Sequence, residues 1–322
     1  MSAIKLNERS LAVVQRLMAD SAALGVAVEN LPGGAVVVDA GLASPGSLEA
    51  GRLMAEACLG GLGRVELCEL PGDIPLMGVK VWVSLPELSC MASQYAGWPV
   101  SLKGGDGQGR FFAMGSGPAR VLRGEEPLLA GIGHEEAPDC AVLILEGRDP
   151  PSAEVAAMIA KACGVDESKL FLVAAPTASL AGSVQIAARV VETGMHKLHE
   201  LGFPLDSVRS GFGTCPLAPV AADDLRAIGR TNDAMLYGAK AWYTVDCEDH
   251  DLSAILARVP SMASRDYGTL FYDLFQRYQG DFYKIDPMLF SPAWVFFTNV
   301  KTGRSFQAGK INPELLRRSF GL

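Results

Sequence analysis

Apolar and polar residues follow two different periods along the first hundred residues, and glycine or proline marks each change of period. The stretch "LNERSLAVVQRLMADSA" has apolar residues at helical spacing with charges between them, which predicts an amphipathic helix and not a signal peptide. Two short β-type runs, "GVAVENL" and "GAVVVDAG", flank "PGG" and predict a hairpin. A helix is expected over residues 47–59, followed by strands in "RVELCEL" and "VKVWVSLP".

The middle of the chain shows another order, in which buried strands alternate with helices. "CAVLILEG" and "KLFLVAAP" are continuous apolar runs of strand length, and "PSAEVAAMIAKACGV" between them has helical spacing. This order predicts parallel strands joined by a right-handed crossover. Further helices are expected over 221–228, 231–239 and 251–259, and "AWVFFTNVKTGRSFQAGKI" predicts a closing hairpin with a "KTG" turn.

These elements predict an α/β protein with two α/β domains, because 322 residues exceed the length of one minimal domain. The closing hairpin resembles the N-terminal strands more than the middle of the chain. We therefore expect a first domain of residues 1–95 completed by residues 288–322, and a second domain of residues 96–287. The glycine-dense segment "SLKGGDGQGRFFAMGSGPARVLRGEEP" is predicted to be a long functional loop at the junction.

Charge and cysteine content narrow the class of protein. The net charge of −8, without any run of Lys or Arg, argues against nucleic acid and anionic membranes as partners. No apolar run reaches the length of a membrane span. The seven cysteines are scattered without a C-x-x-C pair, which is typical of buried, reduced thiols in a cytosolic protein.

The stretch "SLAGSVQIAARVVETGMHKLHELGF" is predicted to be one apolar helix with a narrow polar stripe. Steps of four and three residues place five polar side chains on one side of it: Gln185, Arg189, Glu192, His196 and His199. Arg189 and Glu192 are three residues apart and can pair. The pattern leaves two interpretations open, a solvated stripe with a weak ion pair, or a carboxylate held by an arginine in a partly buried pocket.

Other motifs exclude some chemistries and leave others open. His196 and His199 have metal-ligand spacing but no visible third ligand, so hydrogen bonding near a helix end is favoured. The glycine-dense segment lacks both G-x-G-x-x-G and GK[ST], and no G-x-S-x-G elbow occurs in the chain. That segment could still bring backbone amides and Ser116 to a flat or anionic ligand. Asn232 lies where a helix start is predicted and could act as its N-cap.

Several long strings together resemble a known family. "PTASLAGSVQIAARVVETGMHKLHELGF", "FFAMGSGPAR", "GRTNDAMLYG" and "SRDYGTLFYDLF", with "DFYKIDPMLFSPA", are similar to methenyltetrahydromethanopterin cyclohydrolases, and the similarity spans nearly the whole chain. The resemblance implies a cytoplasmic homotrimer with a ligand cleft between two α/β domains. It implies interconversion of 5,10-methenyl-tetrahydromethanopterin plus water with the 5-formyl compound plus a proton. No redox cofactor and no catalytic metal are implied, and the pterin is the substrate carrier.

In that family an Arg and a Glu on this helix act at the reacting carbon, and the matching positions here are Arg189 and Glu192. Glu192 is expected to act as general acid and base, with Arg189 orienting it. Other residues in matching motifs are expected to contact the pterin or its tail: Gln185, Lys103, Ser116, Arg120, Asn232 and Arg265. Two alternatives stay open, a non-catalytic pterin-binding protein and another pterin-dependent one-carbon enzyme such as a formyltransferase. The composition, rich in Ala, Gly and Arg and poor in Lys, favours a methylotrophic bacterium that oxidises formaldehyde. The pterin is tetrahydromethanopterin or a dephosphorylated bacterial analogue, and the sequence leaves both open.

Overall fold

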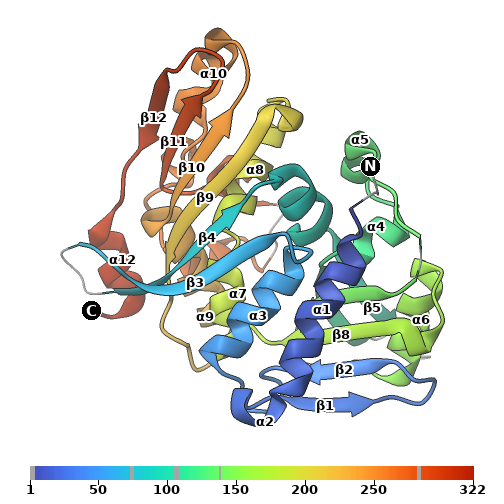
Figure 1. Cartoon of the computed structure of the whole chain (residues 1–322). Coiled ribbons are helices and arrows are strands. Elements are labelled where there is room, and N and C mark those ends of the chain that lie inside the picture. The colour runs from blue at the N-terminus through green and yellow to red at the C-terminus, as the bar shows by residue number, and fades with distance from the viewer. Residues whose placement is uncertain (1–3, 73–75, 104–108, 138, 281–283) are drawn as a thin grey trace. The chain divides into compact units, whose positions relative to one another are not determined.

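A computed structural model of the chain describes residues 4–72, 76–103, 109–137, 139–280 and 284–322. The chain divides into two compact units, Met1–Gly63 with Leu88–Gln185, and Arg64–Glu87 with Ile186–Leu322. Each unit is built on a six-stranded mixed sheet with helices (Figure 1). The structure therefore confirms the predicted pair of α/β domains, while the predicted cleft between them stays a prediction.

The sheet of the first unit has the order β1-β2-β8-β7-β6-β5. β8 pairs in parallel with both β2 and β7, and the remaining pairs are antiparallel. The predicted "PGG" hairpin and the predicted parallel pair are thus confirmed. The strands are β1 (Ala27–Asn30), β2 (Val36–Asp39), β5 (Trp98–Lys103), β6 (Gly109–Ser116), β7 (Ala141–Glu146) and β8 (Leu170–Ala175).

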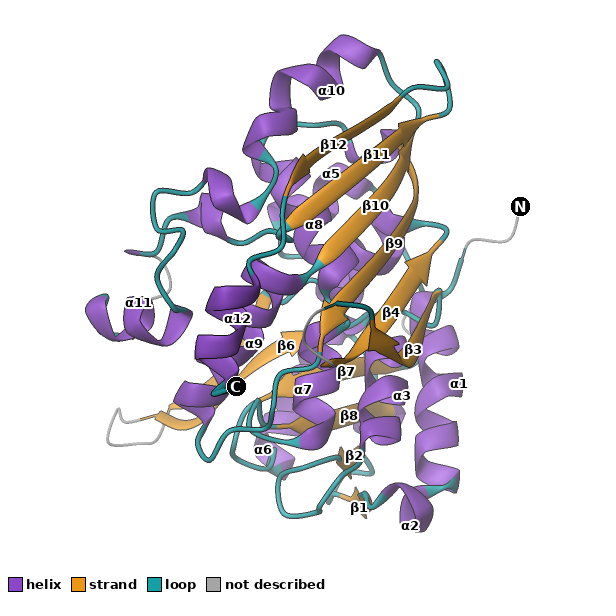
Figure 2. Cartoon of the chain, turned by 90° about the vertical axis from the view of Figure 1, so that its left-hand side faces the viewer, coloured by secondary structure: helices purple, strands orange, loops and turns teal. Residues whose placement is uncertain are grey.

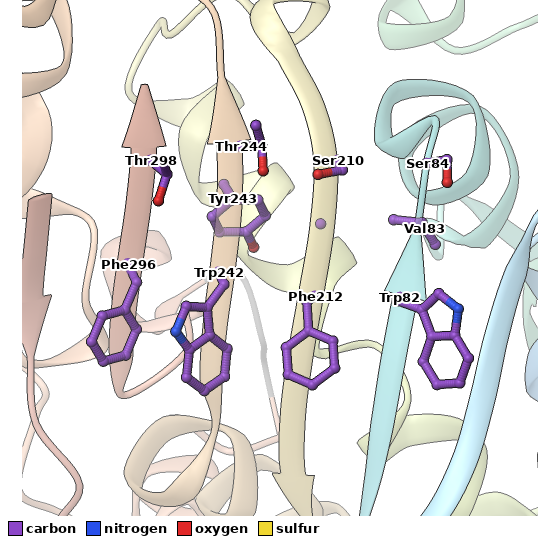
Figure 3. Close-up of a pocket in the computed structure, with 11 residues that line it drawn as sticks. Trp82, Val83, Ser84, Ser210, Phe212, Trp242, Tyr243, Thr244, Phe296 and Thr298 are labelled. Atoms are coloured by element: carbon purple, nitrogen blue, oxygen red, sulfur yellow. The ribbon is translucent and has the colours of Figure 1, made fainter. Parts of the chain in front are cut away.

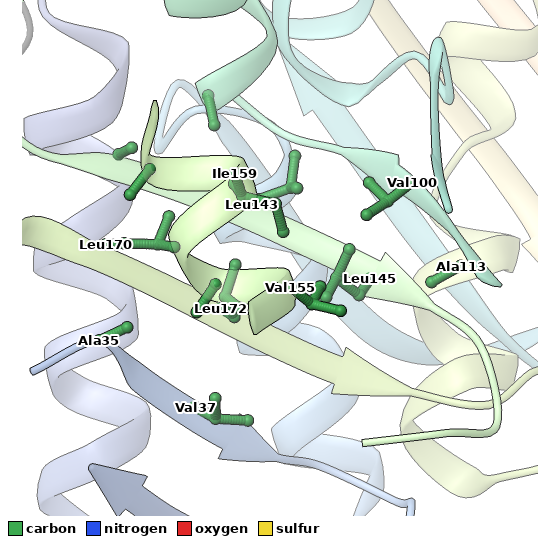
Figure 4. Packing of buried hydrophobic residues seen from close by; sticks show 14 of the residues in the cluster. Ala35, Val37, Val100, Ala113, Leu143, Leu145, Val155, Ile159, Leu170 and Leu172 are labelled. Atoms are coloured by element: carbon green, nitrogen blue, oxygen red, sulfur yellow. The ribbon is translucent and has the colours of Figure 1, made fainter. Parts of the chain in front are cut away.

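Helices cover both faces of this sheet, which is why β7 and β8 are apolar at nearly every position. Leu143 and Leu145 of β7 point to the core under α6, whereas Val142 and Ile144 point to the core under α1 and α3. Figure 4 shows the first of these cores, with Ile159 of α6 beside the strands. The helices of this unit are α1 (Leu6–Ala19), α2 (Ser21–Leu24), α3 (Leu48–Cys58), α4 (Ala119–Arg123), α5 (Pro127–Ile132) and α6 (Ala153–Cys163).

The sheet of the second unit has the order β12-β11-β10-β9-β4-β3, and α8 and α9 pack against it (Figure 2). β10 pairs in parallel with β11 and antiparallel with β9. The strands are β3 (Gly63–Leu70), β4 (Leu76–Val83), β9 (Val208–Pro216), β10 (Lys240–Val245), β11 (Trp294–Asn299) and β12 (Ser305–Gly309). The helices are α8 (Val190–Glu200), α9 (Asp224–Gly238), α10 (Asp249–Ile255), α11 (Phe271–Arg277) and α12 (Pro313–Phe320).

In the described part of the chain, the remaining helices are five short 3-10 helices and two helices in which the chain passes from one unit to the other, the π-helix η1 (Glu87–Gln94) and α7 (Leu180–Ala187). The 3-10 helices are η2 (Glu167–Lys169), η3 (Leu205–Ser207), η4 (Leu256–Arg258), η5 (Ser261–Ala263) and η7 (Pro287–Leu289). Among the described residues, no helix combines the length and the apolar character that crossing a bilayer requires.

The two units differ from the predicted domains. The prediction joined residues 1–95 with 288–322 in a first domain and placed residues 96–287 in a second. The closing hairpin β11–β12 exists as predicted, but it extends the second sheet, because Trp294 and Phe296 pair with Lys240 and Trp242 of β10. The strands β3 and β4, which the prediction placed in the first domain, also belong to the second sheet. The prediction grouped the closing hairpin with the N-terminal strands because their residue patterns are alike. Such likeness does not decide which strands pair, since pairing depends on side-chain contacts across the sheet.

Three local predictions are corrected by the structure. The glycine-dense segment forms the hairpin β5–β6 and the helix α4, although residues 104–108 lie outside the described part. The two helices predicted over 221–228 and 231–239 are the single helix α9. Gly229 lies inside α9 because Tyr272 packs there, and a Cβ at Gly229 would approach the Tyr272 Cβ to 2.8 Å. The helix predicted over 251–259 is α10 followed by the 3-10 turn η4.

Candidate active site

The helix predicted to carry the polar stripe is in fact two helices with Arg189 at the junction. Ala188 and Arg189 separate α7 from α8, and Arg189 is the N-cap residue of α8 with φ −80° and ψ 4°. The carbonyl oxygen of Arg189 accepts hydrogen bonds from the Thr193 amide at 2.7 Å and from the Thr193 hydroxyl at 2.9 Å. Glu192 therefore lies in the first turn of α8, where the helix dipole favours a negative charge.

Arg189 and Glu192 form a nearly buried ion pair. The Arg189 Nη1 and Glu192 Oε2 atoms are 3.7 Å apart, and the two side chains are 11% and 7% exposed. This separation makes the contact electrostatic and not a direct hydrogen bond between those two atoms. Of the two interpretations left open by the sequence, the structure favours the partly buried pair over the solvated stripe.

Glycines in the sheet let the first turn of α8 lie directly on the strands. A Cβ at Gly211 would stand 2.4 Å from Val191 Cγ1, and a Cβ at Gly213 would stand 2.6 Å from Val190 Cγ1. The Tyr243 hydroxyl donates a hydrogen bond of 2.9 Å to the Val191 carbonyl oxygen. These contacts fix the backbone directly before Glu192, so the carboxylate is presented from a rigid element.

The last two turns of α8 hold the predicted histidines and a lysine that the sequence analysis did not single out. His196 is largely buried, which lowers its pKa, and its Nε2 atom lies 3.6 Å from Glu200 Oε1. His199 is exposed. No group of three or more metal-ligating side chains occurs in the part of the chain that the structure describes. The predicted role of the two histidines, hydrogen bonding near a helix end, stays a prediction.

Lys197 is fully buried and donates a hydrogen bond to the Met288 carbonyl oxygen. Burial lowers the pKa of Lys197 to about 8, against the opposing attraction of Asp286. The side chain ties α8 to η7. A basic side chain in the last turn of a helix is normally expected to lie in solvent, where it interacts with the helix dipole. The burial of Lys197 could therefore not be predicted from its place in the sequence.

Gln185 lies in the first unit and contacts a carboxylate that the sequence analysis missed. The Gln185 amide donates to Glu146 Oε2 at 3.3 Å, and the Thr177 hydroxyl donates to Glu146 Oε1 at 2.6 Å. Gln185 is 1% exposed. Glu146 ends β7 at the carboxyl edge of a parallel pair, the edge at which open α/β sheets commonly bind ligands. That position was the signal by which the sequence could have identified it.

Arg120 has a structural environment that accounts for its complete burial. Its Nη1 donates to the carbonyl oxygens of Met91, Ala92 and Ser93 in η1, and its Nε donates to Glu126 Oε1 at 2.8 Å. Its guanidinium also lies over the Tyr95 ring. These contacts hydrogen-bond the guanidinium within the protein and give Arg120 a structural role. Its contact with substrate stays a prediction.

The remaining predicted residues are dispersed. Ser116 is buried at the end of β6, with its hydroxyl 3.3 Å from Cys58 Sγ. Lys103 is exposed at the end of β5, next to residues outside the described part. Arg265 is exposed, and its backbone amide donates to Asp286 Oδ2 at 3.1 Å. Their roles in binding stay predictions.

Asn232 does not begin a helix. It lies inside α9, where its side-chain amide donates to the Ile228 carbonyl oxygen at 2.9 Å, and the N-cap of α9 is Asp223. The alternative that Asn232 caps a helix start is therefore wrong, because the predicted break before it does not exist. A contact between Asn232 and substrate stays a prediction.

Comparisons with known proteins give a consistent result over the full length. The model of the cyclohydrolase (MCH) family matches residues 5–320. A methenyltetrahydromethanopterin cyclohydrolase of Methylobacillus flagellatus is 45% identical over 318 residues, which cover 98% of this chain and 95% of that protein. Proteins of the same name from Xanthobacter autotrophicus and Methanocaldococcus jannaschii are 45% and 40% identical. Those alignments cover 96% and 99% of this chain, and 90% and 98% of the respective relatives.

Proposed function

The chain belongs to the methenyltetrahydromethanopterin cyclohydrolase family, and we propose from this membership and from the Arg189–Glu192 geometry how it works. It is a hydrolase of a cyclic amidine C–N bond. It interconverts 5,10-methenyl-tetrahydromethanopterin, or a dephosphorylated analogue, plus water with the 5-formyl compound plus a proton. The observation that carries the mechanism is the nearly buried carboxylate of Glu192 beside a guanidinium.

The substrate carbon determines what the protein must supply. The methenyl carbon lies between two nitrogens in a cationic amidinium, so it is already electrophilic and water needs only a well-placed base. A carboxylate also stabilises the positive charge of this substrate. The methenyl and formyl carbons have the same oxidation level, so we propose that the reaction uses no redox cofactor. We also propose that the Glu192 carboxylate, and not a catalytic metal, activates the water.

In the proposed mechanism Glu192 moves one proton twice. Glu192 accepts a proton from water as the new C–O bond forms, which gives a neutral carbinolamine. The protonated Glu192 then donates this proton to the departing nitrogen as the C–N bond breaks. The hydroxyl proton of the carbinolamine leaves as the carbonyl forms, and it is the proton that the reaction releases.

Arg189 is proposed to keep Glu192 ionised and oriented. A nearly buried carboxylate is driven towards its neutral form by desolvation, and a guanidinium nearby opposes this. Rigid placement of α8 on the sheet limits the positions that the carboxylate can take. The support for this role is the 3.7 Å separation between Arg189 Nη1 and Glu192 Oε2 at low exposure.

An optical assay on the full chain tests the activity. The ultraviolet absorption of the methenyl substrate should decay faster with the protein than in buffer. Binding without faster decay would support the non-catalytic pterin-binding protein. Decay that requires an added formyl acceptor would support a formyltransferase.

We also propose that the enzyme works in the cytoplasm as a homotrimer, without nucleic acid or membrane as partners. The seven cysteines are thiols and six of them are buried, which suits a reducing compartment. We propose formaldehyde oxidation as the context, with the formyl compound as product. Mass determination of the native protein tests the trimer directly.

A further inference from the structure

Tyr243 is a buried tyrosine whose hydroxyl reaches the helical turn that carries Glu192. It lies on β10 and is 2% exposed. Its ring lies on the face of the sheet against which α8 packs, opposite to the ring of Trp242, its neighbour on the strand (Figure 3). The hydroxyl donates to the carbonyl oxygen of Val191, which is 52 positions away in the sequence. The contact is therefore made by the tertiary structure and not by the helix itself.

The carbonyl that Tyr243 contacts belongs to the same peptide group as the Glu192 amide. A peptide group is planar, so the Val191 carbonyl oxygen and the Glu192 Cα atom lie in one plane. A hydrogen bond to that oxygen limits the rotation of the plane, and with it the position from which the Glu192 side chain begins. Tyr243 is thus linked to Glu192 through one rigid group.

A buried tyrosine hydroxyl usually has a hydrogen-bond partner, so this contact could serve stability alone. Two observations weigh against that interpretation. Val191 lies in α8, where a carbonyl accepts a hydrogen bond from the amide four residues later, so its oxygen does not require the hydroxyl. The Tyr243 ring stacks on Phe297 with centroids 5.4 Å apart, and a phenylalanine would keep that packing. The hydroxyl is therefore required neither by the helix nor by the packing of the ring.

Two glycines make room for the ring and the hydroxyl of Tyr243. A Cβ at Gly194, in α8, would stand 1.9 Å from the hydroxyl oxygen and 2.9 Å from the Cζ atom. A Cβ at Gly211, in β9, would stand 2.4 Å from Val191 Cγ1 and 3.7 Å from Tyr243 Cε1. Glycine destabilises the interior of a helix relative to alanine, and here it lies where the hydroxyl approaches. The close approach is therefore built into both α8 and the sheet.

A second hydroxyl contacts a carbonyl in the same turn, but it carries less weight. The Thr193 hydroxyl donates to the Arg189 carbonyl oxygen at 2.9 Å. Threonine side chains in helices commonly bond the carbonyl four residues earlier, so this contact is a local feature of the helix. The contact from Tyr243 is different, because it ties the turn to a strand of the sheet.

We propose that Tyr243 is a positioning residue for Glu192. Its hydroxyl holds the Val191–Glu192 peptide group on the sheet, so that the carboxylate stays where it takes a proton from the attacking water. The proposal rests on the general-base role proposed above for Glu192. Because Tyr243 acts through the peptide group and not on the substrate, its hydroxyl should affect kcat and leave KM nearly unchanged.

The test is Tyr243→Phe in the optical assay, with kcat and KM measured separately. Small displacements of a catalytic group lower turnover strongly, so we expect kcat to fall by about 5- to 30-fold, with KM within about twofold of wild type. Ser10→Ala is the matched control, because the fully buried Ser10 hydroxyl donates to the Ala57 carbonyl oxygen of α3 at 2.8 Å. This control also removes a buried hydroxyl from a helix carbonyl, and it should keep kcat. Circular dichroism and urea denaturation give the folded fraction of each protein under assay conditions.

A double variant separates positioning from a general loss of stability. Gly194→Ala pushes the Tyr243 hydroxyl away from the helix side, so it should lower kcat in the wild-type background. In Tyr243→Phe the hydroxyl is absent, and the same alanine should lower kcat by a smaller factor. Changes that act through one contact are non-additive in this way, whereas the effects of independent changes on kcat multiply.

The outcomes distinguish this proposal from the function on which it rests. Wild-type kcat in a folded Tyr243→Phe protein overturns the proposal, as do equal losses of kcat in Tyr243→Phe and Ser10→Ala. If Tyr243→Phe does not fold, Gly194→Ala decides: a lower kcat with unchanged KM supports the proposal, and an unchanged kcat overturns it. An inactive wild-type protein overturns the role of Glu192 as well, whereas an active wild type beside an equally active Tyr243→Phe overturns the role of Tyr243 alone.

Discussion

At the scale of single residues, the proposed chemistry depends on how Arg189 and Glu192 are placed. Their pairing could be predicted from a spacing of three residues on a helix. Their low exposure and the break of the helix at Arg189 could not be predicted, because a helical spacing does not specify tertiary packing or where a helix ends. The place of Glu146 at the end of an apolar strand could have identified it, but its partners Thr177 and Gln185 could not be predicted, because they lie 31 and 39 residues away in the sequence.

Arg189→Lys tests whether charge alone is sufficient beside Glu192. Lysine keeps the positive charge but lacks the planar fork of donors, so it should orient the carboxylate poorly. We expect kcat to fall by roughly 10- to 100-fold in the optical assay while the fold is retained. Arg277→Lys, at an exposed position of α11, should be nearly normal. Full activity of Arg189→Lys would show that the arginine geometry is not needed.

Lys197→Met tests the buried lysine through the pH dependence of stability. Burial lowers the pKa of Lys197 to about 8, so between about pH 8 and the ordinary lysine pKa of 10.5 the unfolded chain binds more protons than the folded one. The contribution of Lys197 to the free energy of unfolding therefore rises with pH in this window and is constant below it.

We expect Lys197→Met to lose this rise relative to wild type in urea titrations at several pH values. An identical pH dependence in the two proteins would mean that Lys197 titrates as it does in the unfolded chain. Lys301→Met is the control, because Lys301 is exposed and its pKa is raised by Glu248, not lowered by burial.

At the scale of elements, the position of α8 depends on two glycines of β9. The same glycines made this strand hard to predict from the sequence. Gly211 and Gly213 make "SGFGTC" look like a loop, and no strand was predicted there. The same glycines let the first turn of α8 approach the sheet. The strands with continuous apolar runs were predicted correctly, because their pattern reflects burial on both faces.

Gly194→Ala tests the close contact between α8 and β10. A Cβ at Gly194 would stand 1.9 Å from the Tyr243 hydroxyl oxygen, which donates to the Val191 carbonyl. We expect the variant to lose about 1–3 kcal/mol of stability through overpacking, with a lower kcat because the turn carrying Glu192 shifts.

The matched control is Gly131→Ala, since Gly131 lies in the helix α5 and no atom stands within 4 Å of the place that an alanine methyl would occupy there. Chemical denaturation and the optical assay should both leave this control close to wild type. Equal behaviour of the two alanine variants would contradict the account of how α8 is seated.

At the scale of the whole molecule, the class of fold could be predicted from the sequence. Which strands join the same sheet could not. Strand-rich segments at the two ends of the sequence were expected to share a domain. Instead β1 and β2 join β8 in the first sheet, whereas β3, β4, β11 and β12 join the second. The local pattern of residues predicts strands. It does not predict which distant strands pair, because pairing depends on contacts such as that between Trp242 and Phe296.

The most direct test of the account is the turnover of Glu192→Gln, measured from the decay of methenyl absorption with saturating substrate. Glutamine keeps the shape of the side chain but cannot accept the proton of the attacking water. We expect kcat to fall by about 10²- to 10⁴-fold, while Glu200→Gln, at an exposed position of the same helix, remains near wild type. Near-normal turnover of a folded Glu192→Gln protein would contradict the proposed role of Glu192.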